Sequence, residues 1–460
     1  MPEIHNKFLQ DSEAKAFDLA HRTTISRNIS QYEKNFTKGK LQYKNLELAK
    51  KRVASSKHKP INELDKYLTE FEANFTLRGG KIIWAPNAEE AIKEILALLR
   101  KYDAKTVVKS KSMITEELEL NEHIEKAGIE VIETDLGEFI VQLAKEKPYH
   151  IITPVMHKSK EDVAALFHQK FGTDINATPE QITSFVRKLL RKKFTSADVG
   201  ITGANFIIAD IGGIALTENE GNALMSMSFP QVHIAIAGID KMIPSIRDLD
   251  NIWPLLATHG TGQRLSAYNT IITGPKQEYE KEGPAELYVV LVDNGRTELL
   301  KQTEQRKAML CIRCGACLNF CPVYKNIGGH TYNTTYSGPI GSVITPHMKG
   351  MDDYKHLSFA SSLCGRCTEV CPVNINLHEL LLFNRRDVIK KGFNTTNDKI
   401  IQFLFKKAFL NRKMMDFGNV KIKNYLLIKL VAKHWGQRRD LPVLKPKSFN
   451  RLWREQRDLP

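Results

Sequence analysis

Residues 311–322 read CIRCGACLNFCP, and residues 364–372 read CGRCTEVCP. The first stretch has the spacing C-x2-C-x2-C-x3-C-P, and the second repeats it without the first cysteine, where the chain has Ser361 instead. All seven cysteines of the 460-residue chain lie between positions 311 and 371, so their clustering needs a chemical cause. An odd number of cysteines does not suit a disulfide framework.

The spacing is typical of two iron–sulfur clusters held by paired loops. Three closely spaced cysteines grip one cluster, and the cysteine before proline reaches across to the other. The first cluster then receives four thiolates, from Cys311, Cys314, Cys317 and Cys371. The second receives three, from Cys321, Cys364 and Cys367. We expect two [4Fe–4S] clusters. The second lacks a fourth cysteine and could be [3Fe–4S], or take its last ligand from Ser361, water or a partner.

Structural zinc is the competing interpretation, because paired C-x2-C units also bind Zn²⁺. Structural zinc sites close with four ligands each. Seven cysteines with two C-P endings do not fill one or two such sites. Unliganded thiols would leave the clustering unexplained. Iron–sulfur ligation is the interpretation that accounts for all seven positions as metal ligands.

Positive charge is concentrated at the two ends of the chain. The net charge is +15, and residues 384–460 hold 20 basic and 6 acidic residues. Such a basic tail suggests a partner subunit or an acidic membrane surface, with simple solubility as the alternative. No nucleic-acid motif appears, so nucleic acid is not expected as a partner. Without a secretory signal or an apolar run of ~20 residues, we expect a cytoplasmic protein, or one peripheral to the inner face of the membrane.

Hydrophobic periodicity divides the chain into four regions. These are a helical arm over 1–69, an α/β domain over 70–295, a dicluster domain over 300–380 and a basic tail over 384–460. Alternating strands and helices indicate a mainly parallel sheet. The expected strands are 81–84, 106–109, 129–133, 151–155, 206–209, 213–217, 232–237, 269–273 and 286–292, with a hairpin between 206–209 and 213–217. The expected helices include 64–75, 87–100, one capped by Thr115, 138–144, 161–171, 179–192 and 377–390. The tail is expected to be helical to about Trp435 and extended beyond it.

Several stretches resemble the lactate-utilisation iron–sulfur protein family, LutB/YkgF. They include FEANFTLRGGKIIWAPNAEEA from Phe71, TGANFIIADIGGIALTENEG from Thr202 and SSLCGRCTEVCPVNI from Ser361. The resemblance implies an α/β LUD domain, with a NagB/CoA-transferase-like parallel sheet, and an α-helical ferredoxin-type dicluster domain. It implies other subunits of a lactate-utilisation complex that oxidises L-lactate to pyruvate. It also implies an onward acceptor that could be membrane- or quinone-linked.

Further candidate sites lie at predicted strand ends, where open α/β sheets bind ligands. Glu218 or Glu220 could act as a base or bind a substrate hydroxyl, although a solvated turn is the simpler interpretation. Lys109 and Lys111 could bind a carboxylate. The Gly-containing loop 258–263 could cradle an anion or be structural. His233 is interpreted as a core histidine, and no set of catalytic residues can be assembled.

Three functional hypotheses follow. The chain could be an electron-transfer subunit of a lactate-oxidising complex, without a complete catalytic site of its own. It could be an enzyme whose LUD domain acts on a small carboxylate, with the clusters as an electron exit. It could also be a redox-sensing scaffold. The first hypothesis accounts best for two clusters in series, since they can pass electrons one at a time.

Overall fold

Apolar runs that are buried on both faces form the central sheet. The computed structural model describes residues 2–394, 396–435 and 440–457, in two compact units, 1–388 and 389–460. In the first unit, six parallel strands have the order β1-β10-β7-β4-β2-β3. Their bounds are β1 Lys81–Ala85, β2 Thr106–Lys109, β3 Glu130–Glu133, β4 Val199–Gly203, β7 Val232–Gly238 and β10 Glu286–Val292. Every residue of β7 is buried, as expected for a parallel sheet covered on both faces.

A second, four-stranded sheet has the order β8-β5-β6-β9. Its strands are β5 Phe206–Ile208, β6 Gly213–Glu218, β8 Met242–Ile243 and β9 Tyr268–Ile272. The expected hairpin is confirmed, because β5 and β6 pair antiparallel with Phe206 opposite Ala215. Phe71 and Phe75 of α4 (Leu64–Leu77) share an apolar core with residues of both sheets, so this helix joins them.

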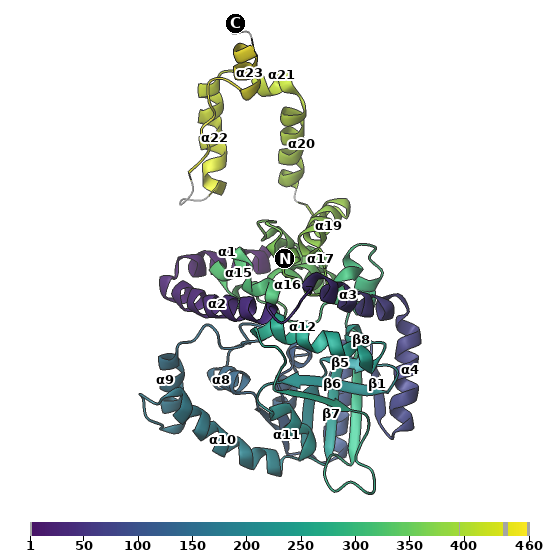
Figure 1. Cartoon of the computed structure of the whole chain (residues 1–460). Helices are drawn as coiled ribbons and strands as arrows, with labels where there is room; N and C mark the ends of the chain where they lie inside the picture. Colours follow the sequence, from purple (N-terminus) through teal and green to yellow (C-terminus); the bar gives the residue numbers. More distant parts are fainter. Residues whose placement is uncertain (1, 395, 436–439, 458–460) are drawn as a thin grey trace. The chain divides into compact units, whose positions relative to one another are not determined.

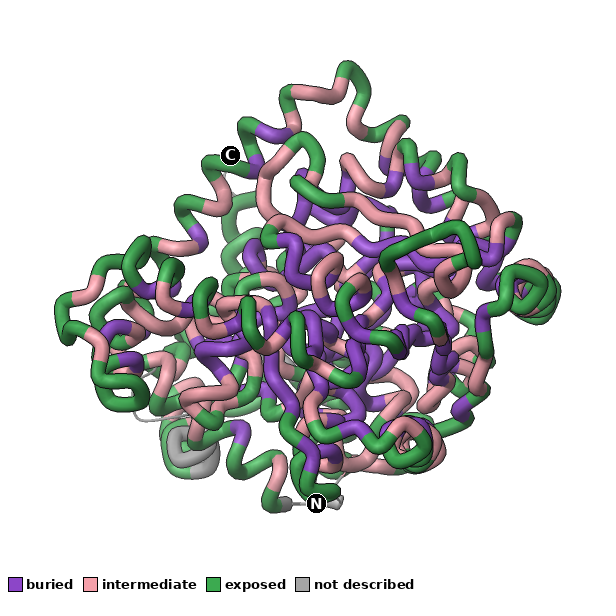
Figure 2. The backbone as a smooth tube through the Cα atoms, turned by 90° about the horizontal axis from the view of Figure 1, so that it is seen from below, coloured by how far each residue is buried: buried purple, intermediate pink, exposed green. Residues whose placement is uncertain are grey.

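Helices cover the parallel sheet on both sides (Figure 1). They are α5 Ala88–Lys101, α6 Met113–Glu117, α7 Leu120–Lys126, α8 Leu136–Ala144, α9 Lys160–Phe171, α10 Pro179–Ser196 and α11 Asn222–Ser228. By contrast, α12 Leu249–Thr261 and α13 Arg296–Leu300 pack in the core that holds the cysteines. Ile95 and Leu99 of α5 pack on β10 and β7 side chains in one core. Phe139 of α8 and Phe167 of α9 belong to another core with α10. Figure 2 shows the buried parts of the backbone gathered in the interior, with exposed segments around them.

The N-terminal helices and the cysteine-bearing segment share a single hydrophobic core. The N-terminal helices are α1 Pro2–Phe17, α2 Leu19–Lys40 and α3 Leu46–Asn62. The cysteine-bearing segment forms α14 Ala316–Asn319, α15 Pro322–Ile327, α16 Gly338–Lys349, α17 Met351–Phe359, α18 Arg366–Glu369 and α19 Leu377–Lys390. Ile25, Phe36 and Val53 pack in the same core as Cys314 and Cys371. Figure 1 shows α1 and α2 beside α15 and α16, so the N-terminal helices help to bury the cysteine loops.

The second unit consists of helices with exposed apolar and basic side chains. They are α20 Thr396–Leu410, α21 Arg412–Asp416, α22 Val420–Trp435 and α23 Phe449–Arg457. Large apolar side chains that remain exposed include Phe403, Phe405, Phe409, Phe417 and Trp453. Among the described residues, no helix is both long enough and apolar enough to cross a bilayer. The expected helical tail is therefore observed in α20 to α22.

Four local predictions were wrong. Residues 151–155 form a turn-rich loop rather than a strand, and this loop packs against the first cysteine loop. Ser112, not Thr115, caps α6, because its hydroxyl accepts from the N–H of Thr115. Residues 258–263 were expected to form a loop, but the chain is helical as far as Thr261, where α12 ends. The end of the chain is helical in α23 and not wholly extended, because Phe449 and Trp453 lie one turn apart and stack.

Candidate metal centre

The first cysteine stretch folds into a loop that reverses direction through two residues with positive φ. Arg313 has φ 58° and Gly315 has φ 75°. At Gly315, a Cβ atom would lie 3.0 Å from Cε1 of His150, so a glycine fits both the space and the left-handed backbone. After Cys321, Pro322 begins α15, a position where its missing N–H costs no helical hydrogen bond.

The second cysteine stretch follows the same backbone course. Leu363 has φ 55° and Gly365 has φ 78°, and Gly365 precedes α18 as Gly315 precedes α14. The N–H of Arg313 donates to Cys311 Sγ at 3.4 Å. The N–H of Leu363 donates in the same way to Ser361 Oγ at 3.2 Å. The missing cysteine is thus replaced by a serine oxygen in an equivalent local position.

The seven cysteines are free of disulfides and gather in two groups. Burial raises the pKa of Cys314, and the nearby thiols that raise it further are those of Cys311 and Cys371. Burial raises the pKa of Cys367 to about 11, and the contributing thiols there are those of Cys321 and Cys364. Cys317 contacts both groups electrostatically, because Cys311, Cys314 and Cys367 all raise its pKa. The cysteine before each proline therefore lies beside the other loop.

This set of donors fits a metal centre better than free thiols. Cys314, Cys317, Cys367 and Cys371 are buried. A buried thiolate is costly unless a cation compensates it, whereas a bound metal deprotonates a coordinating thiol. The N–H of Ile375 donates to Cys371 Sγ at 3.3 Å, an interaction that stabilises a thiolate. Beside Gly315, Nε2 of His150 is buried without a hydrogen-bond partner in the described structure, and an inorganic sulfide could accept from it.

Basic side chains from distant segments surround Cys311. Lys57 of α3 is buried and donates to the carbonyls of Asp240 at 2.5 Å and Met242 at 3.1 Å. Burial lowers the pKa of Lys57 to about 7 and that of Lys241 to about 8, while the Cys311 thiol acts in the opposite direction on both. Cations so placed are electrostatically suited to a centre built from anionic thiolates.

A buried ion-pair network ties the parallel sheet to the segment that leads into the cysteine loops. Arg296 donates to Glu117 Oε1 at 2.9 Å and Oε2 at 2.8 Å, and to Asp240 at 2.6 Å. Tyr336, after the first cysteine loop, donates its hydroxyl to Glu117 at 2.7 Å. These residues come from segments far apart in the sequence and form no local motif, which is why sequence reasoning missed them.

A cavity of about 320 Å³ lies between the strand ends and the first cysteine loop, and we call it the strand-end pocket. Its lining from the α/β region includes Asn205, Glu220 and Lys241. From the cysteine-bearing segment, it is lined by Arg313 and Tyr336 among others. Ligand sites of open α/β folds lie at the carboxyl ends of the strands, where this pocket is found.

Of the strand-end residues suggested by the sequence, some line the pocket and others have structural roles. Glu218 and Lys111 line the strand-end pocket. The carboxylate of Glu218 accepts from the N–H groups of Ala223 at 2.7 Å and Leu224 at 2.9 Å, so it caps α11, although burial raises its pKa. Lys109 instead pairs with buried Glu133 at 2.6 Å and supports the sheet.

His233 is confirmed as a core histidine. Its side chain is fully buried in β7, and its Nε2 lies 2.8 Å from Thr202 Oγ1. Burial lowers the pKa of His233 to about 3, so the imidazole is neutral near pH 7. These contacts indicate a structural role within the parallel sheet.

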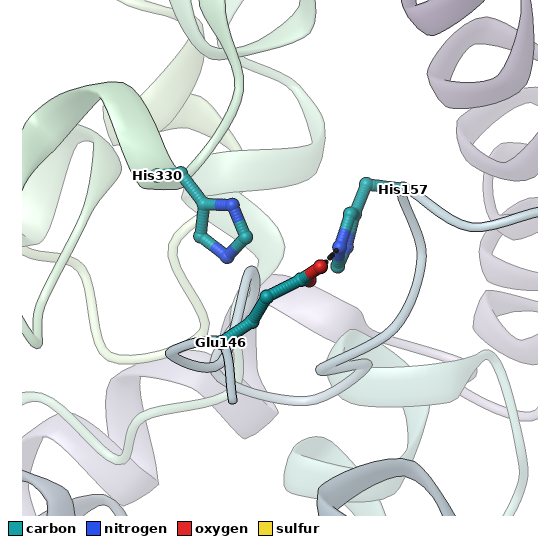
Figure 3. Close-up of side chains that lie close together, drawn as sticks. All are labelled: Glu146, His157 and His330. Carbon is teal, nitrogen blue, oxygen red and sulfur yellow. Dashed lines mark hydrogen bonds and ion pairs between the residues drawn. The ribbon is translucent and has the colours of Figure 1, made fainter. Parts of the chain in front are cut away.

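Glu146, His157 and His330 form a third cluster of possible metal ligands (Figure 3). Glu146 is already paired, with His157 at 2.8 Å and with Lys158 at 2.6 Å. The amine of Lys158 therefore supplies positive charge where a metal ion would bind. Nε2 of His330 lies 2.7 Å from the carbonyl oxygen of Lys147, and burial lowers the pKa of His157 to about 4. The cluster is best described as a hydrogen-bonded contact between the 145–159 loop and the cysteine-bearing segment.

Comparison with known families identifies both parts of the first unit. Residues 68–292 match the LUD domain, and residues 307–375 match the 4Fe-4S dicluster domain. The chain is therefore a LUD-domain protein with an iron–sulfur dicluster domain, and the expected fold class is confirmed.

Its relatives define the family further. Lactate utilization protein B of Bacillus cytotoxicus is 41% identical over 408 residues, covering 86% of each chain. The protein of the same name from Bacillus pumilus is 42% identical, again covering 86% of each chain, and that from Bacillus thuringiensis is 44% identical over 78% of this chain and 76% of its own. The chain belongs to the lactate utilization protein B family. A solved DUF162 family protein from Deinococcus radiodurans covers 50% of this chain and 97% of its own at 14% identity, with a TM-score of 0.29.

Proposed function

We propose that the chain is the iron–sulfur electron-transfer subunit of a complex that oxidises L-lactate to pyruvate. The family supports a role in lactate utilisation, and the dicluster domain supports iron–sulfur clusters. The observation that carries the proposal is that buried cysteines of both stretches, Cys314 and Cys317 with Cys367 and Cys371, lie in one core. Lactate gives up two electrons, and a pair of bound clusters would accept and release them singly.

In this proposal, Cys311, Cys314, Cys317 and Cys371 hold the first cluster, and Cys321, Cys364 and Cys367 hold the second. The protein sets their environments differently. In the first set Cys314, Cys317 and Cys371 are buried and Cys311 is half-buried. In the second set Cys367 is buried, Cys321 is half-buried and Cys364 is exposed. Because burial and hydrogen bonding to sulfur tune cluster potentials, the two sites should differ in potential. The exposed second site is the one that an external acceptor can approach.

The tail is proposed to contact an anionic membrane surface at its cytoplasmic side, near the other subunits and a quinone-linked acceptor. Exposed aromatic side chains such as Phe403 and Phe405 lie on α20 next to Lys406 and Lys407. This combination of apolar and basic side chains is typical of helices that lie in the membrane interface. If the tail binds a partner subunit instead, the protein should not bind vesicles, and its association with the other subunits should require the tail.

The cluster assignment is tested by anaerobic purification, iron and sulfide analysis, and electron paramagnetic resonance. We expect about seven or eight irons per chain, the content of two clusters of this type. Cys371→Ser should selectively disturb the first cluster, and Cys367→Ser the second, giving two different losses of signal. A colourless protein that carries only zinc would refute the proposal. Loss of the same signal in both variants would refute the division of ligands.

A further inference from the structure

The strand-end pocket contains two basic groups whose hydrogen-bonding capacity is unused. Arg313 stacks over Tyr336 at 4.4 Å, and its Nε and Nη1 are buried without hydrogen-bond partners in the described part of the chain. Its closest acidic partner is Asp240, at 3.5 Å from Nη2. Lys241 lines the same pocket and makes no hydrogen bond or ion pair with any described residue. Buried donors of this kind are costly unless an acceptor satisfies them.

The neighbouring charges do not supply that acceptor. Asp240 is the nearest carboxylate: Arg296 binds its Oδ1 at 2.6 Å, and its Oδ2 lies 3.5 Å from Nη2 of Arg313 but makes no hydrogen bond with Nε or Nη1. Lys57 is satisfied by backbone carbonyls, and Lys111 donates to the carbonyl of Ile152, so neither leaves an unpaired group in the pocket. The charge of the Cys311 thiolate acts to raise the pKa of both Arg313 and Lys241. No cysteine, however, is among the described residues that line the cavity.

We propose that the strand-end pocket binds a small 2-hydroxy or 2-oxo carboxylate, with Arg313 and Lys241 holding the carboxylate group. A guanidinium next to an ammonium is well suited to a planar carboxylate, which accepts two charge-assisted hydrogen bonds. The lining also includes polar groups such as Asn205 and Glu220, which could bind a hydroxyl or keto oxygen. The choice of lactate and pyruvate as ligands rests on the proposed function, whereas the carboxylate site rests on the pocket alone.

The pocket also borders the first cluster site, because Arg313 lies within the loop between Cys311 and Cys314. A carboxylate bound to Arg313 would add negative charge next to that loop. The second cysteine group does not contribute to the lining of the pocket, within the described residues. Ligand binding should therefore change the spectrum of the first cluster and leave that of the second unchanged.

Calorimetric titration of the anaerobic holoprotein with L-lactate and with pyruvate tests the proposal. We expect saturable binding that weakens about tenfold or more in Lys241→Met, since a hydrogen bond to a charged group contributes about 1.5–3 kcal/mol. Arg313→Lys, which keeps the charge but loses the planar fork, should weaken binding less than Arg313→Met. Lys126→Met, an exposed helix surface change, is the matched control and should bind as the unaltered protein does.

The readouts separate this proposal from the proposed function. Holoprotein that contains both clusters but binds neither acid at millimolar concentration would overturn the pocket assignment and leave electron transfer standing. Binding that is unchanged in Lys241→Met and Arg313→Met would also overturn it. Pyruvate binding by a protein that lacks iron would leave the pocket standing and remove the electron-transfer role. Iron content is measured on every variant, so a failure to assemble the first cluster is recognised directly.

A second inference concerns the missing cysteine and rests on a separate observation. The backbones of the two loops match at Arg313 and Leu363, and both N–H groups donate to the side chain two residues earlier. In the first loop that side chain is a thiol, and in the second it is the hydroxyl of Ser361. Ser361 is half-buried, whereas the neighbouring Cys364 is exposed. We infer that Ser361 Oγ is the fourth ligand of the second cluster, which is then a four-iron cluster.

Ser361→Ala and Ser361→Cys test this inference on the anaerobic holoprotein. We expect Ser361→Ala to lose about one iron per chain and to show a three-iron resonance signal, because a three-ligand site retains only three irons. Ser361→Cys should keep all irons and shift the signal of the second cluster alone. Iron content and resonance in Ser361→Ala identical to those of the unaltered protein would refute the inference. A three-iron cluster in the unaltered protein would refute it equally, while the proposed relay function would remain.

Discussion

Replacing Glu117 with glutamine should destabilise the first unit by about 3–5 kcal/mol, the usual cost of breaking a buried ion pair from one side. The side chains of Glu117 and Arg296 are only 1% and 3% exposed. Glu117 accepts two hydrogen bonds from Arg296, one from Asn294 at 2.7 Å and one from Tyr336 at 2.7 Å. A glutamine keeps one acceptor oxygen but turns an amide NH₂ toward these donors. It also leaves Arg296 with Asp240 as its remaining carboxylate partner.

The matched control is Glu119→Gln, two positions along the chain. Glu119 pairs with Lys147 at 2.6 Å, but the two side chains are 48% and 68% exposed. Exposed ion pairs contribute about 0–1 kcal/mol, so this variant should be nearly neutral. Urea unfolding under anaerobic conditions, followed by circular dichroism, compares the midpoints of the three proteins. Equal midpoints for Glu117→Gln and Glu119→Gln would refute the importance of the buried network.

The effect should depend on pH in a defined direction. Burial alone would raise the pKa of Glu117, but the charge and hydrogen bonds of Arg296 hold it below the ordinary glutamate value. A carboxyl whose pKa is depressed by folding contributes stability above its unfolded pKa and loses it as the pH falls through the folded pKa. The difference between the unaltered protein and Glu117→Gln should therefore be full at pH 7 and shrink below the ordinary glutamate pKa. A difference that grows toward acid pH would contradict this reasoning.

Three further predictions concern the cysteine loops, the parallel sheet and the tail. Gly365→Ala should lower the free energy of unfolding by about 1–2 kcal/mol, because alanine must adopt a left-handed backbone there. Gly315→Ala should lower it further, because its Cβ would also contact His150. Thermal unfolding of the two variants tests this order. Lys109→Met leaves Glu133 buried and unpaired, so its urea midpoint should fall by the equivalent of about 3–5 kcal/mol, whereas exposed Lys105→Met should change little. The double variant Lys406→Glu with Lys407→Glu should sediment less with anionic vesicles than the unaltered protein does. Added salt should likewise reduce sedimentation of the unaltered protein. If neither change has an effect, the tail does not bind the membrane surface through its charge.

The sequence predicts best what is local. The cysteine spacing, the apolar runs of β7 and β10, and the periodic helix α5 each contain their own structural signal. The sequence does not predict the central strand β4, because two of the five residues of Val199–Gly203 are glycines, which weaken a strand pattern that tertiary pairing overrides. Residues 151–155 are apolar enough to suggest a strand, but Ile151 and Ile152 pack against Gly315 of the first cysteine loop instead. Apolar residues with no neighbouring strand to pair with do not form a sheet.

The strand-end pocket could not be predicted, because it is assembled from segments that the sequence separates widely. Lys241 follows β7, whereas Arg313 belongs to a cysteine loop. Taken alone in the sequence, Lys241 and Arg313 would each be interpreted as an ordinary surface cation. Only the fold shows that both cations line a common cavity and that Arg296 already binds one oxygen of the nearest carboxylate, Asp240. Which charges pair inside the folded protein depends on which side chains become neighbours in space, and spacing along the sequence does not show this.

The arrangement of the first unit gives the proposed relay a direction. The N-terminal helices pack in one core with the buried cysteines: Tyr32 of α2 donates to the carbonyl of His259 at 2.6 Å, and Lys50 of α3 donates to the carbonyl of Glu369 at 3.2 Å. The strand-end pocket borders the first cysteine group, while the second group includes the exposed Cys364. Substrate-derived electrons that enter near the pocket can reach an outside acceptor most directly through the second group. On the proposed function, the exposed Cys364 therefore favours exit at the second site.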